Sequence, residues 1–259
     1  MPKSIKMIAS IMQPTFLPWI GYFDLVDQSD IFVFLDNVQF KKRSWQQRNK
    51  VRTPSGLEWL TVPTLVSGRF EQTISEVEIK TDAFPEKQIK TLQHHYSKTP
   101  YFAAYWPELE AILHGTKQDK SLARLNIDII RWLAGQFEIV SKFVLASEIH
   151  TESQRSERLV GILEYIKAET YLSPCGSFEY LYQDRDVFAR AGIPIIFQNF
   201  VHPVYKQRYS PFEIGASAID MLFNEGGKGA ACLMRSGRKP SEHFEDVIKI
   251  NKDVVYANK

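Results

Sequence analysis

Residues that can bind phosphate, sugar or carboxylate groups follow three predicted strands, at the point where each strand ends. Gln13–Pro18 (QPTFLP) comes after the first strand, Asp36–Asn37 after the second and Ser173–Ser177 (SPCGS) after a later one. In open parallel sheets, ligands bind beyond the carboxyl ends of the strands. We therefore expect these segments to meet at one binding site.

A helix that begins near Pro18 offers a place for phosphate groups. Proline is tolerated in the first turn of a helix. The free backbone N–H groups of Trp19, Ile20 and Gly21 would attract an anion, and the glycine would allow its close approach. The other interpretation is that Gly21 only permits tight packing of the helix on a strand. The residues expected to bind a cofactor are Gln13, Pro14, Pro18, Gly21, Tyr22 and Asn37.

A basic segment follows the second strand. Residues 41–52 (KKRSWQQRNKVR) contain six basic residues and no acidic one. Lys41 and Arg48 would neutralise charge that develops during a reaction, and they are expected to be catalytic. Trp45 could stack on a base or a sugar, or bind nucleic acid; alternatively, the segment is a solvated loop. The substrate-binding residues expected here are Asp36, Lys42, Trp45 and Asn49.

The second half of the chain carries two reactive side chains. His202, which follows another predicted strand, is a candidate general base and the third expected catalytic residue. Cys175 is either a thiol that carries an acyl group or a small buried cysteine. No metal site is predicted, because the adjacent His94 and His95 would point about 100° apart on a helix. Further substrate-binding residues expected in this half are Gly176, Ser177, Tyr205 and Gln207.

The composition limits the class of protein. The 259 residues are 44% hydrophobic and 24% charged, and the formal net charge is +2. Such a chain can bury a substantial core and has no overall signature of a polyanion-binding protein. Gln13 and Pro14 end the first apolar stretch early, and no window approaches the roughly 20 apolar residues of a membrane helix. We expect a cytoplasmic protein with no membrane insertion.

Strands and helices alternate along the chain. Apolar runs predict strands at 5–12, 30–36, 142–147, 170–174 and 194–200, with helices at 19–30, 157–168, 184–192 and 212–224. Further strands are expected at 57–63 and 74–80, and helices at 84–138. This order predicts a Rossmann-like, mostly parallel α/β sheet with a helical insertion. We expect a single α/β domain over residues 1–235, with its helical lobe at 84–138, and a polar tail at 236–259.

The first loop resembles that of the nucleotidylyltransferase superfamily, to which pantothenate synthetase belongs. "PTFLPWIGYFDL" corresponds to the loop that these enzymes end with Gly-His, and Tyr22 stands in place of the second histidine. "FLDNVQF" is similar at Asn37, Gln39 and Phe40. The resemblance implies a nucleotidylyltransferase-like fold, with ATP phosphates held near Gly21.

An ordered series of segments over most of the chain resembles the WbqC-like family. It includes Gln13-Pro14, Gly21-Tyr22-Phe23 and Arg48-Asn49, followed by "YLSPCGSFEYL", "FVHPVYKQRY" and "SAIDMLFNEG". Members of this family occur in bacterial gene clusters for surface polysaccharides such as O-antigen of lipopolysaccharide. A glycine-transferase role has been proposed for some of them. The resemblance therefore implies transfer of an amino acid to an amino sugar.

The two resemblances are chemically compatible. An amide made from a carboxylate and an amine needs prior activation, most simply as an acyl-adenylate made from ATP, with or without Mg²⁺. The expected enzyme is a transferase or an ATP-dependent amide ligase that uses an amino acid and an amino-sugar nucleotide. One alternative is an acyltransferase that takes its acyl group from a thioester or an aminoacyl-tRNA; otherwise nucleic acid is not an expected partner. Another is a non-catalytic sugar-nucleotide-binding protein. The oligomeric state stays open.

Overall fold

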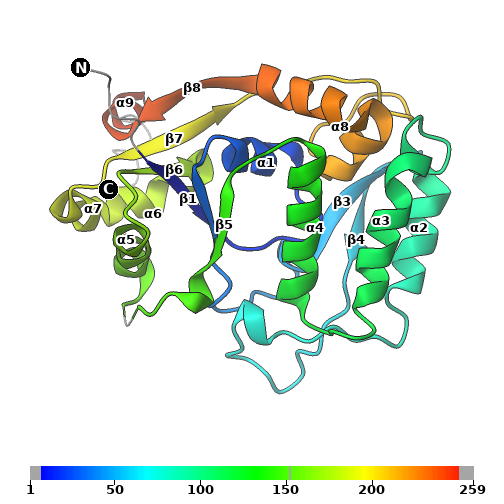
Figure 1. Ribbon diagram of the computed structural model, residues 1–259, viewed down its shortest axis with the longest axis horizontal. Coiled ribbons are helices and arrows are strands. Elements are labelled where there is room, and N and C mark those ends of the chain that lie inside the picture. Colours follow the sequence, from blue (N-terminus) through cyan, green and yellow to red (C-terminus); the bar gives the residue numbers. More distant parts are fainter. Residues whose placement is uncertain (1–6, 152, 251–259) are drawn as a thin grey trace.

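The computed structural model describes residues 7–151 and 153–250. A twisted sheet with strand order β5-β2-β1-β6-β7-β8 lies between two layers of helices, and a helical lobe extends from one side (Figure 1). The first five strands in that order are parallel, and β8 is antiparallel to β7. The strands are β1 (Ile8–Met12), β2 (Ile31–Phe34), β5 (Lys142–Leu145), β6 (Thr170–Pro174), β7 (Ile195–Phe200) and β8 (Arg238–His243). The expected Rossmann-like α/β fold is confirmed.

The parallel strands are buried on both faces, which explains their continuous apolar sequences. In β2, Phe32 and Phe34 point into one hydrophobic cluster, whereas Val33 between them points into another. Helices α1 (Ile20–Asp27), α4 (Leu122–Gln136) and α8 (Ala218–Gly237) contribute to the first cluster. Helices α5 (Arg155–Tyr165), α6 (Phe178–Gln183) and α7 (Arg185–Ala191) contribute to the second. β1 lies between β2 and β6, so the strand order reverses beside it.

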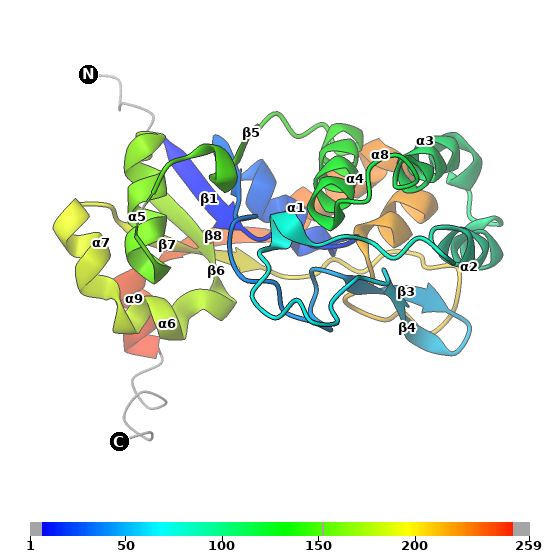
Figure 2. The same ribbon diagram turned by 90° about the horizontal axis from the view of Figure 1, so that it is seen from below.

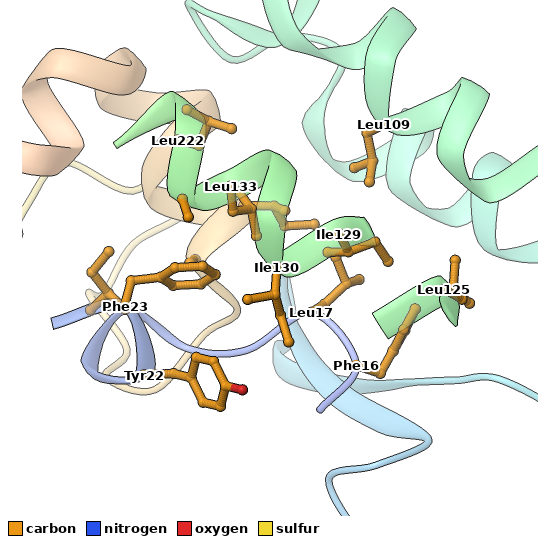
Figure 3. Packing of buried hydrophobic residues seen from close by; sticks show 14 of the residues in the cluster. Phe16, Leu17, Tyr22, Phe23, Leu109, Leu125, Ile129, Ile130, Leu133 and Leu222 are labelled. Atoms are coloured by element: carbon orange, nitrogen blue, oxygen red, sulfur yellow. The ribbon is translucent and has the colours of Figure 1, made fainter. Parts of the chain in front are cut away.

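The helical middle of the chain is confirmed. It consists of α2 (Glu86–Tyr96), α3 (Phe102–Gly115) and α4, and it packs beside the long helix α8. Figure 3 shows how leucine and isoleucine side chains of α4 reach Phe16 and Leu17 of the first loop and Phe23 of α1. The helical lobe and one face of the sheet therefore share a single core.

Two segments between β2 and the helical lobe differ from their predicted structure. β3 (Arg48–Thr53) and β4 (Gly56–Thr61) form a separate antiparallel hairpin beneath the helical lobe (Figure 2), so the hairpin is not part of the main sheet. The strand expected at 74–80 is wrong. Ile74–Glu76 is a short 3₁₀ helix, because Thr73 and Glu76 form a capping box that satisfies the first N–H groups of a helical turn.

The segment expected as a polar tail contributes to the sheet. β8 pairs with β7, and α9 (Phe244–Ile250) follows it; residues 251–259 lie outside the described residues. A strand at the edge of a sheet can be polar, and Pro240 lies where a bulge shifts the register between β7 and β8. The helix expected at 212–224 instead begins at Ala218, where the Ser217 side chain caps it.

None of the helices formed by residues 7–151 and 153–250 is both long enough and apolar enough to cross a membrane.

Candidate functional site

A cavity of about 640 Å³ opens beyond the carboxyl ends of β1 and β2. We call it the cleft. It lies where the strand order reverses beside β1, the position at which open α/β sheets bind their ligands. Its volume is in the range of small-molecule sites, roughly 300 to 1,000 Å³. Its polar lining residues include Gln13, Ser44, Gln46, Arg155, Ser156, Arg158, Tyr180 and Asp184.

Two smaller hollows adjoin the cleft. One, of about 540 Å³, includes Asn37 and shares Arg155 and Arg158 with the cleft. The other, of about 440 Å³, includes Lys41 and Lys42 and shares Gln13, Ser44 and Gln46 with the cleft. Because they share lining residues, the three spaces are adjacent, and we call them together the groove. We call the two smaller spaces the Asn37 hollow and the lysine hollow.

The first turn of α5 places two arginines between the cleft and the Asn37 hollow. Arg158 is held by hydrogen bonds to two backbone carbonyls, that of Asn37 at 3.1 Å and that of Ser153 at 3.0 Å. Arg155 adopts a left-handed backbone conformation with φ of 51°, a strained geometry that often accompanies functional sites. Guanidinium groups match phosphate oxygens in a planar, two-point geometry. The pair is therefore suited to bind a phosphorylated ligand.

One acid lines the cleft together with the arginines. Asp184 supplies the single carboxylate among the described residues that line the cleft. Its Oδ2 accepts a hydrogen bond of 2.6 Å from the Ser156 hydroxyl, which fixes the carboxylate at the entrance to α7. A carboxylate in this position can hold a cationic amine or accept a proton from it.

Another part of the cleft lining is a loop held by several hydrogen bonds. The side chain of Gln46 accepts a hydrogen bond from the backbone N–H of Lys41 and donates one to Oε1 of Gln13, both at 2.8 Å. The fully buried Asn126 of α4 donates from Nδ2 to the carbonyls of Pro14 (3.1 Å) and Gln46 (2.8 Å). One amide of the helical lobe thus joins the two loops that shape the cleft.

The WbqC-like family model matches residues 13–231, which include both site loops, the arginine pair and Asp184. The chain belongs to the WbqC-like protein family. It is also 31% identical over 225 residues to the uncharacterized protein Rv1507c of Mycobacterium tuberculosis, covering 86% of this chain and 96% of that protein. No solved structure matches this chain. Family membership is consistent with a role linked to polysaccharide gene clusters and with an enzymatic activity.

Six of the residues expected at a site lie along the groove of this WbqC-like protein. They are Gln13, Trp45 and Ser177 in the cleft, Asn37 in the Asn37 hollow, and Lys41 and Lys42 in the lysine hollow. Both lysines are exposed. Asn37 donates from Nδ2 to the Ala146 carbonyl, while its Oδ1 is buried with no hydrogen-bond partner among the described residues.

The start of α1 is filled by protein. A Cβ atom on Gly21 would lie 2.3 Å from carbons of the Trp19 indole, so this ring occupies the space beside Gly21 through which an anion was expected to approach. Tyr22 packs against Phe32 in the core and donates its hydroxyl to the Gln13 carbonyl at 3.3 Å. Burial raises the pKa of Tyr22 well above its usual value. Gly21 therefore serves tight packing, and Pro18 beside it is buried.

Three more expected residues make structural contacts. Both oxygens of Asp36 accept hydrogen bonds from Ser147, from the N–H at 2.9 Å and the hydroxyl at 2.6 Å. Asn49 is buried and donates to the Phe16 carbonyl at 3.1 Å. The guanidinium of Arg48 lies 4.1 Å from the ring centre of Trp59 on the neighbouring strand. None of the three lines the groove among the described residues.

His202, Tyr205 and Gln207 gather away from the cleft, beside α8. The His202 ring stacks between Trp19 and Tyr205, and burial lowers its pKa. Tyr205 donates its hydroxyl to Oδ2 of the buried Asp220 at 2.5 Å, and Gln207 donates to the same atom at 3.1 Å. Burial raises the pKa of Asp220. This network fastens the chain after β7 to α8.

Cys175 and Gly176 lie outside the lining of the groove. Cys175 is exposed, so the interpretation of a small buried cysteine is wrong. Its thiol donates to the Gln198 carbonyl at 2.8 Å, and partial desolvation raises its pKa, which disfavours the nucleophilic thiolate. Gly176 is exposed. In the part of the chain that the structure describes, no three His, Cys, Asp or Glu side chains are grouped as a metal site would require.

Sequence reasoning missed Arg155, Arg158, Tyr180 and Asp184. The rule that ligands bind beyond the carboxyl ends of parallel strands, which predicted Gln13, could also have predicted the two arginines. Their segment "SQRSER" (153–158) lies between β5 and the body of α5.

Proposed function

We propose that this protein transfers an activated aminoacyl group, such as glycyl, to the amino group of a sugar nucleotide during synthesis of a bacterial surface polysaccharide. Membership of the WbqC-like family supports a role in the synthesis of a surface polysaccharide. The observation that supports this reaction is the cleft beside β1, which is lined by two arginines and one carboxylate. A diphosphate and an amine on one substrate are the groups that such a pair of features would bind.

Arg155 and Arg158 would hold the diphosphate of the sugar nucleotide. Charge-assisted, two-point hydrogen bonds from guanidinium to phosphate are among the stronger polar contacts in proteins. Arg158 is already fixed by its two backbone carbonyl partners, so little side-chain freedom is lost when the ligand binds.

Asp184 would act as the general base that accepts a proton from the amine. The amine nitrogen attacks the acyl carbon, a C–N bond forms, and the bond between the acyl carbon and its activating group breaks. The nitrogen loses one proton in this step, which Asp184 accepts, and the activating group leaves with its electron pair. The Ser156 hydroxyl holds the carboxylate in one orientation for that transfer.

The amino acid must arrive activated. ATP would supply that activation by forming an acyl-adenylate. The start of α1 does not fit its phosphates, because the Trp19 indole covers Gly21. The lysine hollow fits better, since Lys41 and Lys42 are exposed cations beside the cleft. These two side chains would hold the phosphates and offset their charge.

The test combines glycine, ATP and UDP-glucosamine with the purified protein, and measures pyrophosphate release and the mass of the aminoacylated product. We expect Arg155→Ala to lower turnover at least 10-fold. Arg124→Ala, on the outer side of α4, is the matched control and should not change turnover. Turnover with glycyl-tRNA or a glycyl thioester, but not with glycine and ATP, would mean that the activated donor is a carrier-bound glycyl group and not an acyl-adenylate. A wild-type protein that binds UDP-glucosamine but makes no product with any donor would overturn the transferase proposal.

A further inference from the structure

Two neighbouring tryptophans are exposed beside the cleft. Trp45 is 51% exposed and Trp59 is 44% exposed, and their ring centres lie 5.1 Å apart. Tryptophan usually buries most of its large apolar surface, so adjacent exposed indoles commonly mark a binding surface. Trp45 lines the cleft itself.

Trp45 is braced by a cation–aromatic stack. Trp59, on β4, has the guanidinium of Arg48 at 4.1 Å from its ring centre and the ammonium of Lys50 at 5.3 Å. Both cations come from β3, where Lys50 is the direct partner of Trp59. The hairpin therefore supports Trp59, and Trp59 supports Trp45.

The backbone around Trp45 is also fixed. Its carbonyl accepts a hydrogen bond from the N–H of Phe16 at 2.9 Å. The side chains of Gln46 and Gln47 accept bonds from the N–H groups of Lys41 and Arg43, both at 2.8 Å. A ring held in this way loses little freedom when a planar group stacks on it.

We infer that Trp45 is the stacking platform for the nucleobase of the sugar nucleotide, with Trp59 and Arg48 as its support. The inference rests on the proposed function. Arg155 and Arg158 line the same cleft and would hold the diphosphate. Tyr180, 43% exposed in this cleft, offers a hydroxyl that suits the sugar. A base on the braced indole and a sugar near Tyr180 would place the phosphates between them.

The experiment compares the binding of two probes by calorimetry: UDP-glucosamine, which has a base, and glucosamine-1-phosphate, which has none. We expect Trp45→Ala to weaken UDP-glucosamine binding about 10- to 100-fold, the range of base–aromatic stacking. Binding of glucosamine-1-phosphate should change less than about 2-fold on the same stacking argument. Trp45→Phe should restore part of the loss. Trp59→Ala, which removes the support, should give a smaller loss with the same selectivity.

Tyr165→Ala is the matched control, because Tyr165 is 66% exposed at the far end of α5. It should bind both probes as the wild type does. Equal weakening of both probes by Trp45→Ala would overturn the inference. Unchanged binding of both probes by Trp45→Ala would also overturn the inference, provided that Arg155→Ala weakens the binding of both. That result would not contradict the proposed function. A wild-type protein that binds neither probe would overturn both.

Discussion

Asp24 of α1 and Arg238 of β8, which are 214 residues apart in the chain, form an ion pair of 2.8 Å between Oδ1 and Nε. The carboxylate is fully buried, and its other oxygen accepts hydrogen bonds of 2.7 Å from the amides of Gln28 and Gln198. Arg238 also contacts Asp27 at 2.6 Å. This pair fastens a polar edge strand to the centre of the fold.

Arg238→Ala should therefore destabilise the protein by about 2 kcal/mol, because a buried carboxylate loses its charged partner but keeps two amide donors. The measurement is the free energy of unfolding in urea. Arg124→Ala breaks an exposed pair with Asp128 on α4 and should cost less than about 0.5 kcal/mol. Equal effects of the two substitutions on the free energy of unfolding would show that the ion pair between Asp24 and Arg238 adds no more stability than an exposed pair.

Stability should fall in acid, in part through Asp27. Burial alone would raise the pKa of Asp27, but hydrogen bonds and charge from Arg235 and Arg238 outweigh it, so the folded-state pKa is lowered. A carboxyl group whose pKa is lower in the folded than in the unfolded protein stabilises the folded state above about pH 4. This stabilisation is lost as the pH falls through the folded-state pKa. Asp27→Asn should be less stable than the wild type at pH 7, and the gap should close toward pH 3. A gap that stays constant over urea titrations from pH 7 to pH 3 would contradict this.

Gly21→Ala should destabilise the fold through Trp19. The added Cβ would meet the indole carbons at 2.3 Å, so the ring must move, at a cost of about 1–3 kcal/mol. In a Trp19→Ala background the same change should cost almost nothing, which a double-mutant cycle measures. Additive costs would mean that the crowding at Gly21 has another source. Binding of UDP-glucosamine to the double variant should stay as in the wild type.

Asp184→Asn should slow the chemical step rather than weaken binding. The amide oxygen can still accept the Ser156 hydroxyl, but asparagine cannot take the proton of the amine. We expect a fall in kcat of about 10²-fold or more, within the range of general-base contributions. Asp186→Asn, with a side chain 82% exposed in the first turn of α7, is the control and should be neutral. If kcat is unchanged in Asp184→Asn, the proton leaves by another route.

Cys175→Ala should retain turnover. Its thiol donates to a carbonyl and has a raised pKa, so it is a poor acyl carrier near neutral pH. The steady-state rate with the active donor measures this directly. Loss of the rate in a variant whose circular dichroism matches that of the wild type would support a thiol-bound acyl group.

The buried strands were predictable because each is a continuous apolar run that stops at a polar or proline-containing segment. β8 was not, because an edge strand is selected by its partners, here Asp24 and β7, and not by its own hydrophobicity. The segment 74–80 was predicted to be a strand. The buried residues are in fact Ile74, Val77 and Ile79, which suits a helical turn followed by an extended segment.

The site was predictable in position but only partly in its members. Gln13 follows β1 and lines the cleft, as the strand-end rule expects. Gly21 follows the same strand, yet the ring that fills its surroundings belongs to Trp19, two residues earlier, and only the folded geometry shows this. Arg155 and Arg158 carry no apolar periodicity, so a pattern based on hydrophobicity passes over them.

The two hydrogen bonds from Asn126 give the helical lobe a role at the cleft that its position would not suggest. Since one amide fixes both site loops, the lobe acts as a clamp for the groove instead of an independent module. Chimeras that exchange residues 84–138 between relatives would thus keep this connection only if the donor lobe carries an amide at this position. The choice of a donor lobe therefore depends on this side chain as well as on the ends of the insertion.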